Sequence, residues 1–237
     1  MSINFKPLGD SAIFITFGDE ISEEIHLSIK KFMKILEDHP FYGFIEMVPS
    51  YTNICIYYDV YQVNQWKFEG SSPYEKVVNY VKTLLQKEEI KVNEISRVIE
   101  IPVCYGGIYG PDLTEVATYN QLSEQEVIQI HTKNECLIYM LGFAPGFAFM
   151  GGMDEKIATP RKATPRLKIH AGSVGIAGKQ TGIYPFETPG GWQIIGRTPL
   201  KLFLPDQNPP TLFRAGDRIR FVAISEQEFK NLAGEIK

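Results

Sequence analysis

The chain has 237 residues, of which 44% are hydrophobic and 22% are charged, and its formal net charge at pH 7 is -4. This composition excludes intrinsic disorder, collagen and coiled coil, and it argues against nucleic acid as the main partner, because phosphate binding needs surplus Lys and Arg. The start of the chain shows no signal peptide and no apolar run approaches the roughly 20 residues that span a bilayer, so we expect a soluble, cytoplasmic protein.

Residues 12–17 form a β-rich run and are predicted to be the first strand. A helix is expected next, capped by Ser22, with acidic side chains in its first turn and lysines later, as the helix dipole prefers. Two strands, 44–48 and 53–58, follow the helix. Apolar residues at helical spacing give the helix one buried face: Ile21, Ile25, Ile29, Phe32 and Leu36.

A second helix is predicted from Ser72, where Ser72 and Glu75 form a capping box with Pro73 at the first helical position. Residues 97–103 then read as one more strand. The resulting order, β-α-β-β-α-β, predicts a ferredoxin-like α/β sandwich over residues 1–100. The apolar face of the second helix comprises Val77, Val78, Val81, Leu84 and Leu85.

The second half of the chain, residues 101–237, has a different pattern. Short helices are expected after Asp112 and at a capping box that begins at Ser123. Beyond Cys136, short apolar runs are broken by Gly and Pro, which is typical of a β-barrel or a sandwich. Residues 218–224 form a final strand before a C-terminal helix capped by Ser225. We therefore predict an α+β protein with two domains, 1–100 and 101–237.

General catalytic and metal-binding motifs are missing from the sequence. Three cysteines, Cys55, Cys104 and Cys136, are too few and too scattered for a disulfide framework or a zinc site, and no metal ligands are assigned. The segment 173–180 comes nearest to a phosphate-binding P-loop, but Gln180 stands where Ser or Thr would bind magnesium. A standard P-loop is therefore excluded, while ATP binding of another kind stays open.

Glycine is spaced through aromatic residues in the segment 141–152. Glycine permits the backbone to approach a ligand or a second chain closely, so Phe143, Phe147 and Phe149 could line a groove. The alternative is a tight barrel corner with these rings in the core, which we prefer for the rings considered alone. Trp192, farther along the chain, would also usually lie in the core.

Residues 159–170 form the only dense cationic segment in this acidic chain. Two Thr-Pro steps restrict its backbone, so Arg161 and Arg166 would project from a stiffened loop. The planar fork of arginine suits a carboxylate or a phosphate. A solvated basic loop is the alternative, which we prefer for Lys162 and Lys168, whereas both interpretations stay open for the two arginines.

The segments 170–185 and 187–199 carry further candidate residues. His170 could act as an acid or a base near neutral pH, although an isolated histidine is more often structural. Lys179 and Gln180 could orient a carboxylate or a lactam, and Arg197 lies at a predicted strand end. The glycines that could admit a ligand to the backbone are Gly172, Gly175, Gly178, Gly190 and Gly191.

Several of these segments together resemble one protein family. The chain is similar, over nearly its whole length, to the family that includes the B subunit of 5-oxoprolinase, the inhibitor of sporulation histidine kinase A, and proteins labelled allophanate hydrolase subunit 1. The resemblance implies a small N-terminal α/β domain followed by a cyclophilin-like β-barrel. The segments that carry it are 9–12, 105–107, 110–113, 142–152, 170–178 and 189–192.

The resemblance also implies a function. The B subunit of 5-oxoprolinase, with a homologous C subunit plus the A subunit, forms an ATP-dependent enzyme that opens the lactam of 5-oxo-L-proline to give L-glutamate. ATP would serve the complex by phosphorylating the amide oxygen, and the metal requirement is unknown. By resemblance, a catalytic role is assigned to His170, Lys179, Gln180 and Arg197, and anion contacts to Arg161 and Arg166.

Other functions stay open. The barrel could dock on a sensor histidine kinase and inhibit it, with a proline-containing segment in the aromatic groove. The chain could also belong to an allophanate or urea-amide hydrolase or to a carboxyltransferase, because related domains occur in urea carboxylase. A prolyl isomerase is a weaker option, since no match to its catalytic arginine arrangement is visible. We expect the enzyme subunit, inactive on its own.

Overall fold

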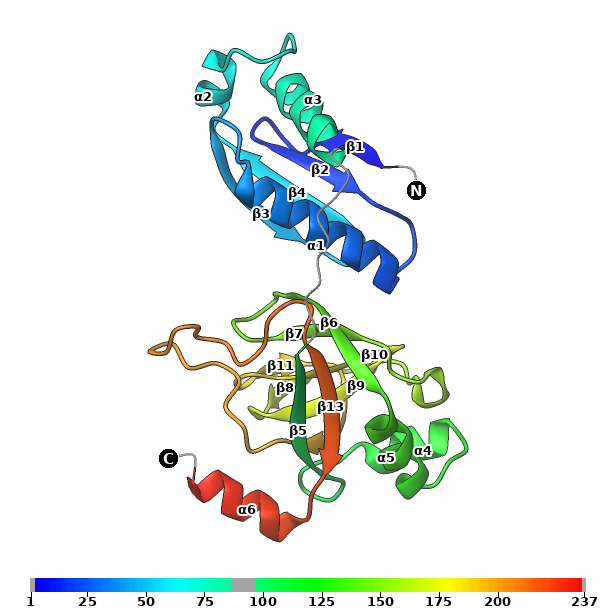
Figure 1. Cartoon of the computed structure of the whole chain (residues 1–237). Helices are drawn as coiled ribbons and strands as arrows, with labels where there is room; N and C mark the ends of the chain where they lie inside the picture. The colour runs from blue at the N-terminus through cyan, green and yellow to red at the C-terminus, as the bar shows by residue number, and fades with distance from the viewer. Residues whose placement is uncertain (1–2, 87–96, 236–237) are drawn as a thin grey trace. The chain divides into compact units, whose positions relative to one another are not determined.

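The computed structural model describes residues 3–86 and 97–235 of the chain (Figure 1). The chain divides into two compact units, Met1–Glu94 and Ile95–Lys237. Each unit has its own sheet and its own hydrophobic core, and helices and strands occur in both, which confirms the α+β class. None of the helices in the described ranges combines the length and the apolar character needed to cross a membrane.

The first unit is a four-stranded antiparallel sheet of order β1-β2-β4-β3, packed against helices (Figure 1). One core takes its buried side chains from β2, β4 and the two long helices, α1 and α3. The elements are β1 (Asn4–Pro7), β2 (Ala12–Thr16), α1 (Glu23–Asp38), β3 (Phe44–Pro49), β4 (Asn53–Tyr58), α2 (Val60–Gln65) and α3 (Pro73–Leu85).

Both long helices begin where the sequence predicts. The hydroxyl of Ser22 accepts a hydrogen bond from the Ile25 amide, and that of Ser72 accepts one from the Glu75 amide, each at 3.2 Å. The returning bond of the second capping box is displaced by one residue, since the Glu75 carboxylate accepts from the amide of Ser71. The predicted apolar face of α1 is buried apart from Ile21, which precedes the helix and is 52% exposed.

The strand order predicted for residues 1–100 needs one correction. The strand expected at 97–103 is β5 (Val98–Tyr105), and it lies in the sheet of the second unit, where it pairs in parallel with β13 (Arg218–Ala223). Its alternating apolar side chains would suit either sheet, but Ile101 and Val103 are fully buried in the second core. In the first sheet, the place beside β2 that this strand would have taken is filled by β1, antiparallel to β2.

The second unit is built on a seven-stranded sheet of order β10-β9-β12-β5-β13-β6-β7, and β8 pairs with β11 in a separate two-stranded sheet. Because β7 and β10, the two ends of the order, also lie against each other, the sheet curls into a nearly closed barrel (Figure 1). The cyclophilin-like character of this barrel stays a prediction. The remaining elements are α4 (Leu113–Tyr119), α5 (Glu124–Lys133), β6 (Glu135–Leu141), β7 (Ala148–Gly151), the 3-10 helix η1 (Glu155–Ile157), β8 (Arg166–Ile169), β9 (Ser173–Ala177), β10 (Gln180–Ile183), β11 (Thr188–Gly190), β12 (Gln193–Arg197) and α6 (Glu226–Glu235).

Two groups of buried side chains fill the second unit. The larger group is the barrel core, in which Phe213 and Phe221 are at most 1% exposed. The smaller group is rich in aromatic residues and is separate from the first. Its buried members are Phe147, Ile169, Ala177, Tyr184, Trp192 and Ile194. This aromatic cluster forms the floor of the candidate site.

A buried histidine fastens α5 to the barrel. The ring Nδ1 of His131 lies 2.8 Å from the hydroxyl of Tyr105 on β5, and its Nε2 lies 2.9 Å from the hydroxyl of Thr181 on β10. His131 is 3% exposed, and burial lowers its pKa to about 3. The imidazole is therefore neutral at neutral pH and bridges two strands of the barrel.

Because of His131, the free energy of unfolding is expected to decrease as the pH is lowered from 7. The unfolded chain protonates this residue near pH 6.5, whereas the folded chain does so only near pH 3. Between these values the unfolded state binds the extra proton, so acidification destabilises the fold by up to about 1.4 kcal/mol per pH unit. Urea unfolding at pH 7 and pH 5 measures the slope. His131→Gln, which keeps hydrogen-bonding groups but does not titrate, should flatten it; an equal slope in both proteins contradicts the assignment.

Candidate functional site

An aromatic cavity with a volume of about 370 Å³ lies in the second unit. It takes its walls from the segments 143–149, 161–165 and 184–192, which are far apart in the sequence. All four residues predicted to line a groove are in its lining, together with three of the predicted anion-binding residues. The full lining is Phe143, Phe147, Phe149, Arg161, Pro165, Tyr184, Pro189, Gly190, Gly191 and Trp192.

Edge-to-face ring contacts hold the cavity walls. The ring centroid of Phe147 lies 5.5 Å from that of Phe143, 5.1 Å from that of Phe149 and 5.8 Å from that of Trp192, with interplanar angles of 72°, 69° and 88°. Phe147 and Trp192 are buried, while Phe143 is 72% exposed. Phe143 also has a φ of 66°, a conformation that a non-glycine residue adopts only where its surroundings hold it. The cavity therefore has a packed floor and an exposed ring among its walls.

Arg161 places a positive charge on this aromatic cavity. Its guanidinium carbon lies over the Trp192 ring, 5.9 Å from the ring centroid, within the range of a cation–π contact. Hydrogen bonds fix the backbone on both sides of it. The carbonyl oxygen of Pro160 accepts from the Gln193 side chain at 3.2 Å, and the amide of Lys162 donates to the carbonyl of Gly191 at 2.8 Å. The guanidinium is thus presented from a fixed backbone position.

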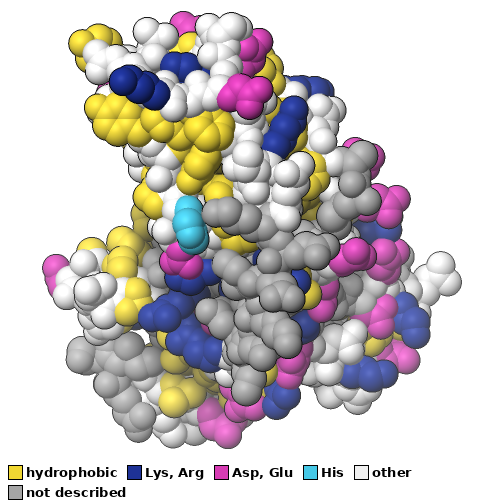
Figure 2. Space-filling view, turned by 45° about the horizontal axis from the view of Figure 1, so that its top comes forward, with side chains coloured by type: hydrophobic (Ala, Val, Ile, Leu, Met, Phe, Trp, Pro, Cys, Tyr) yellow, Lys and Arg dark blue, Asp and Glu magenta, His cyan; other side chains and the backbone are white. Residues whose placement is uncertain are grey.

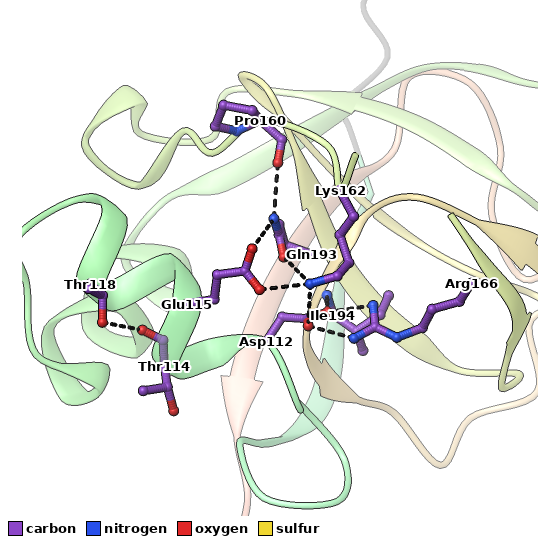
Figure 3. A network of polar contacts seen from close by, with 9 residues as sticks. All are labelled: Asp112, Thr114, Glu115, Thr118, Pro160, Lys162, Arg166, Gln193 and Ile194. Atoms are coloured by element: carbon purple, nitrogen blue, oxygen red, sulfur yellow. Dashed lines mark hydrogen bonds and ion pairs between the residues drawn. The ribbon is translucent and has the colours of Figure 1, made fainter. Parts of the chain in front are cut away.

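The loop that carries Arg161 is anchored by a buried carboxylate, Asp112 (Figure 3). Both terminal nitrogens of Arg166 donate to Asp112, at 2.8 and 2.5 Å. The amide of Ile194 donates to the same carboxylate at 2.7 Å, and the Lys162 ammonium lies 3.2 Å from it. Lys162 also pairs with Glu115 at 2.7 Å. Lys162 is therefore held in a network, and the expectation that it is merely solvated is wrong.

The same contacts account for the ionisation of Asp112. Burial raises the pKa of this carboxyl group, but hydrogen bonds from Arg166, from the Ile194 amide and from Lys162 outweigh that effect and bring the pKa below its ordinary value. Asp112 is thus a stable anion at neutral pH. Arg166, which was predicted as an anion contact, has this protein carboxylate as its partner and lies outside the cavity lining.

Acidic partners neutralise most of the cationic segment. The face of the molecule in Figure 2 shows Lys and Arg side chains interspersed with Asp and Glu. Lys168 pairs with Glu187 at 2.8 Å, in addition to the pairs that Lys162 and Arg166 make. For Arg161, no acidic partner is found among the residues that the structure describes. The excess positive charge of the segment is therefore located at the cavity.

Tyr184 contributes a hydroxyl group to the same cavity. Burial raises the pKa of Tyr184 to about 12, even though the charge of Arg161 and a backbone hydrogen bond with Trp192 act in the opposite direction. The phenol is thus protonated at neutral pH. A Cβ atom at Gly190 would overlap with this hydroxyl, so the absence of a side chain at Gly190 leaves room for it. The cavity offers one cation and one neutral hydroxyl among aromatic walls.

The four residues assigned a catalytic role lie outside this lining. His170 is exposed, with its Nδ1 3.6 Å from a Glu187 oxygen. Lys179 pairs on the surface with Glu155 at 2.8 Å. Arg197 donates from Nε to the carbonyl of Ala171 at 2.9 Å, and Gln180 begins β10. The structure does not gather these four residues at the cavity, and their catalytic roles stay predictions.

The predicted glycines divide into two groups. Gly190 and Gly191 line the cavity, whereas Gly172, Gly175 and Gly178 belong to β9 and its flanking turns. The turn at Gly178 joins β9 directly to β10. The segment 173–180 is therefore a hairpin without the following helix that a P-loop needs. No group of three or more His, Cys, Asp and Glu side chains that could hold a metal occurs within residues 3–86 and 97–235.

Sequence reasoning missed several residues of the site. Pro165, Tyr184 and Pro189 lie inside segments of interest but carry no motif that marks them as lining residues. In the sequence, Asp112 is marked only as the residue before a predicted helix. Its role as an anchor is not visible there, because its partners Arg166 and Ile194 are distant in sequence. Contacts over such separations become visible only in the fold.

Comparisons with known proteins agree over nearly the whole chain. Residues 3–213 match the family model described as carboxyltransferase domain, subdomain C and D. The chain is 55% identical to the B subunit of 5-oxoprolinase from Bacillus subtilis (strain 168), over 94% of each chain. It is 49% identical to a conserved uncharacterized protein from Pyrococcus horikoshii whose crystal structure it matches with a TM-score of 0.55, covering 95% of this chain and 100% of that one. The crystal structure of K. lactis urea amidolyase matches with a TM-score of 0.78 at 18% identity, covering 99% of this chain and 15% of that one, and shows the fold alone.

Proposed function

We propose a function from one premise: this chain belongs to the carboxyltransferase-domain family and, within it, to the relatives of the 5-oxoprolinase B subunit. On that premise the chain is the B subunit of an ATP-dependent 5-oxoprolinase, which converts 5-oxo-L-proline to L-glutamate together with the A and C subunits of the enzyme. The observation that carries the proposal is the 55% identity to a protein of that name over 94% of both chains.

The content of the cavity supports a role within a complex. Among its lining residues are a guanidinium, a protonated phenol and aromatic rings, but no carboxylate, thiol or imidazole. Such a cavity can bind and orient a substrate, whereas opening an amide also requires a group that activates water and one that protonates the leaving nitrogen. The remaining groups would come from the partner subunits, so the chain would be inactive on its own.

ATP belongs to the proposal only at the level of the complex. The segment that comes nearest to a phosphate-binding loop is the β9–β10 hairpin, which does not fit that role. Coupling to ATP hydrolysis provides the driving force for opening the lactam, in which one water adds to the ring carbonyl carbon and the C–N bond breaks. We assign no step of ATP chemistry to residues of this chain.

Reconstitution tests the proposal. The purified chain is combined with the A and C subunits, 5-oxo-L-proline and ATP, and release of L-glutamate is measured. We expect glutamate only when all three proteins and ATP are present, and none from this chain alone. Full activity of the other two proteins without this chain would contradict the proposal, as would no activity from the complete trio.

A second candidate function rests on the exposed ring of Phe143 beside an aromatic cavity. Such a surface also suits a proline-containing protein segment, so the chain could dock on a sensor histidine kinase and inhibit it. Autophosphorylation of candidate kinases with and without the chain tests this role. Unchanged autophosphorylation at micromolar chain concentrations counts against it.

A further inference from the structure

The aromatic cavity has the dimensions and the chemistry of a binding site for a small cyclic acid. At about 370 Å³ it lies near the lower end of the range for small-molecule pockets, about 300–1,000 Å³. Its walls are predominantly aromatic or proline side chains, which favour contact with an apolar ring. Three polar side-chain groups lie in the lining, the guanidinium of Arg161, the hydroxyl of Tyr184 and the indole N–H of Trp192, and only the guanidinium carries a charge.

The single cation in the lining, Arg161, points to a single negative charge on the ligand. Arginine binds a carboxylate through two parallel N–H donors, and the protonated phenol of Tyr184 can add a third donor. One guanidinium balances the single charge of a carboxylate, whereas a phosphate group carries a charge of about −1.5 to −2 at pH 7. Arg161 is available for this role, because Asp112, Glu115 and Glu187 pair with its neighbours and no acid among the described residues pairs with it.

We propose that this cavity holds the five-membered ring of 5-oxo-L-proline against its aromatic walls while Arg161 pairs with the carboxylate of the substrate. This inference rests on the proposed function and extends it by assigning substrate recognition to this chain. The alternative occupant, a proline within a protein segment, has no carboxylate and would leave Arg161 unpaired, so the observations favour the free acid.

Binding to the full chain provides the first test. Fluorescence of Trp192 is followed while 5-oxo-L-proline is added, and 2-pyrrolidinone, which has the same ring without the carboxylate, is the matched ligand. We expect 5-oxo-L-proline to bind at least about tenfold more tightly, the lower bound for a charge-assisted pair. Trp192→Phe identifies the part of the signal that comes from the cavity, because Trp66 lies in the first unit.

Variants of Arg161 separate the carboxylate contact from the ring contact. Arg161→Met should lower the affinity for 5-oxo-L-proline to that for 2-pyrrolidinone without changing the latter, and Arg161→Lys should restore part of the difference. Lys168→Met removes a cation of the same segment outside the cavity and should bind as the native chain does. Gly191→Val should lower the affinity for both ligands, because its side chain narrows the cavity. A Cβ at Gly191 would meet its nearest atoms at an ordinary 3.7 Å, and urea unfolding of Gly191→Val checks that the two further methyl groups leave the fold intact.

The reconstituted complex decides between failure of this inference and failure of the proposed function. With Arg161→Met we expect the KM for 5-oxo-L-proline to rise at least about tenfold, with a smaller effect on kcat. If the native trio is active and Arg161→Met and Gly191→Val leave KM unchanged, the cavity is not the substrate site although the function stands. If the native trio is inactive, the function itself fails. Tighter binding of a proline-containing peptide than of 5-oxo-L-proline, lost in Gly191→Val, would assign the cavity to a protein partner instead.

Discussion

Replacing Asp112 with alanine is expected to lower the free energy of unfolding by about 3 kcal/mol, the lower end of the cost of removing one partner from a buried ion pair, because the side chain of Arg166 stays 30% exposed. The change leaves Arg166 and Lys162 without their shared carboxylate and the Ile194 amide without its acceptor. Chemical denaturation of the full chain measures the loss. The substitution should also weaken binding in the cavity, because Arg166 and Lys162 fix the segment that carries Arg161.

Glu115→Gln is the matched control for this prediction. Glu115 pairs with the same lysine, but its side chain is 54% exposed, and ion pairs at such positions contribute less than about 1 kcal/mol. The unfolding free energy measured at acidic pH gives a second test of the role of Asp112. Its pKa is lowered in the folded chain, so its stabilising effect is present above the ordinary pKa of an aspartate and is lost as the pH falls through the folded value. An unfolding free energy for Asp112→Ala no lower than that of Glu115→Gln would contradict the anchoring role.

Replacing Gly172 with alanine is expected to cost about 3 kcal/mol, near the upper end of what single substitutions usually cost. Its φ is 78°, and a Cβ atom there would overlap with the carbonyl oxygen of Thr198. The backbone has little freedom to shift, because the amide of Gly172 donates to the backbone carbonyl of Tyr184 at 2.7 Å and its carbonyl accepts from the amide of Thr198 at 2.9 Å. The requirement for glycine at this position is therefore explained by the fold.

Gly178→Ala separates backbone strain from steric overlap. Gly178 also has a positive φ, 59°, but a Cβ atom there would have no neighbour within 4 Å. Only the cost of the left-handed conformation remains, about 1–2 kcal/mol. Thermal and urea unfolding of both variants compare the two effects. Equal losses in Gly172→Ala and Gly178→Ala would mean that the overlap at Thr198 is relieved without cost.

Local signals predicted most of the elements. The caps at Ser22, Ser72 and Ser123 and the helical spacing of apolar residues correctly located α1, α3 and α5, because these features act within one or two turns. β1 and α2 were missed, since each is short and lacks a distinctive pattern. The strand at 97–103 was recognised but placed in the wrong sheet, because its pairing with β13 joins residues about 120 positions apart.

The candidate site, too, was predicted only as far as local sequence signals reach. Aromatic and glycine spacing selected Phe143, Phe147, Phe149, Gly190 and Gly191, which the fold brings to one cavity. Residue type alone could not separate Arg161 from Arg166, because the difference lies in Asp112, a carboxylate 54 residues away from the second arginine. The ion pairs of a cationic segment therefore determine which of its charges is left without an acidic partner among the described residues.

Because β1 lies beside β2, the first sheet fills that edge with a strand of its own unit and takes none from the second. The first sheet has the neighbours expected of the ferredoxin-like order, but its edge strand comes from the beginning of the unit and not from its end, as in a circular permutant. Within the described residues, no strand of either sheet has its partners on the other side of the division between residues 94 and 95. A recombination breakpoint there would divide the gene into two modules, each encoding the described strands of its own sheet.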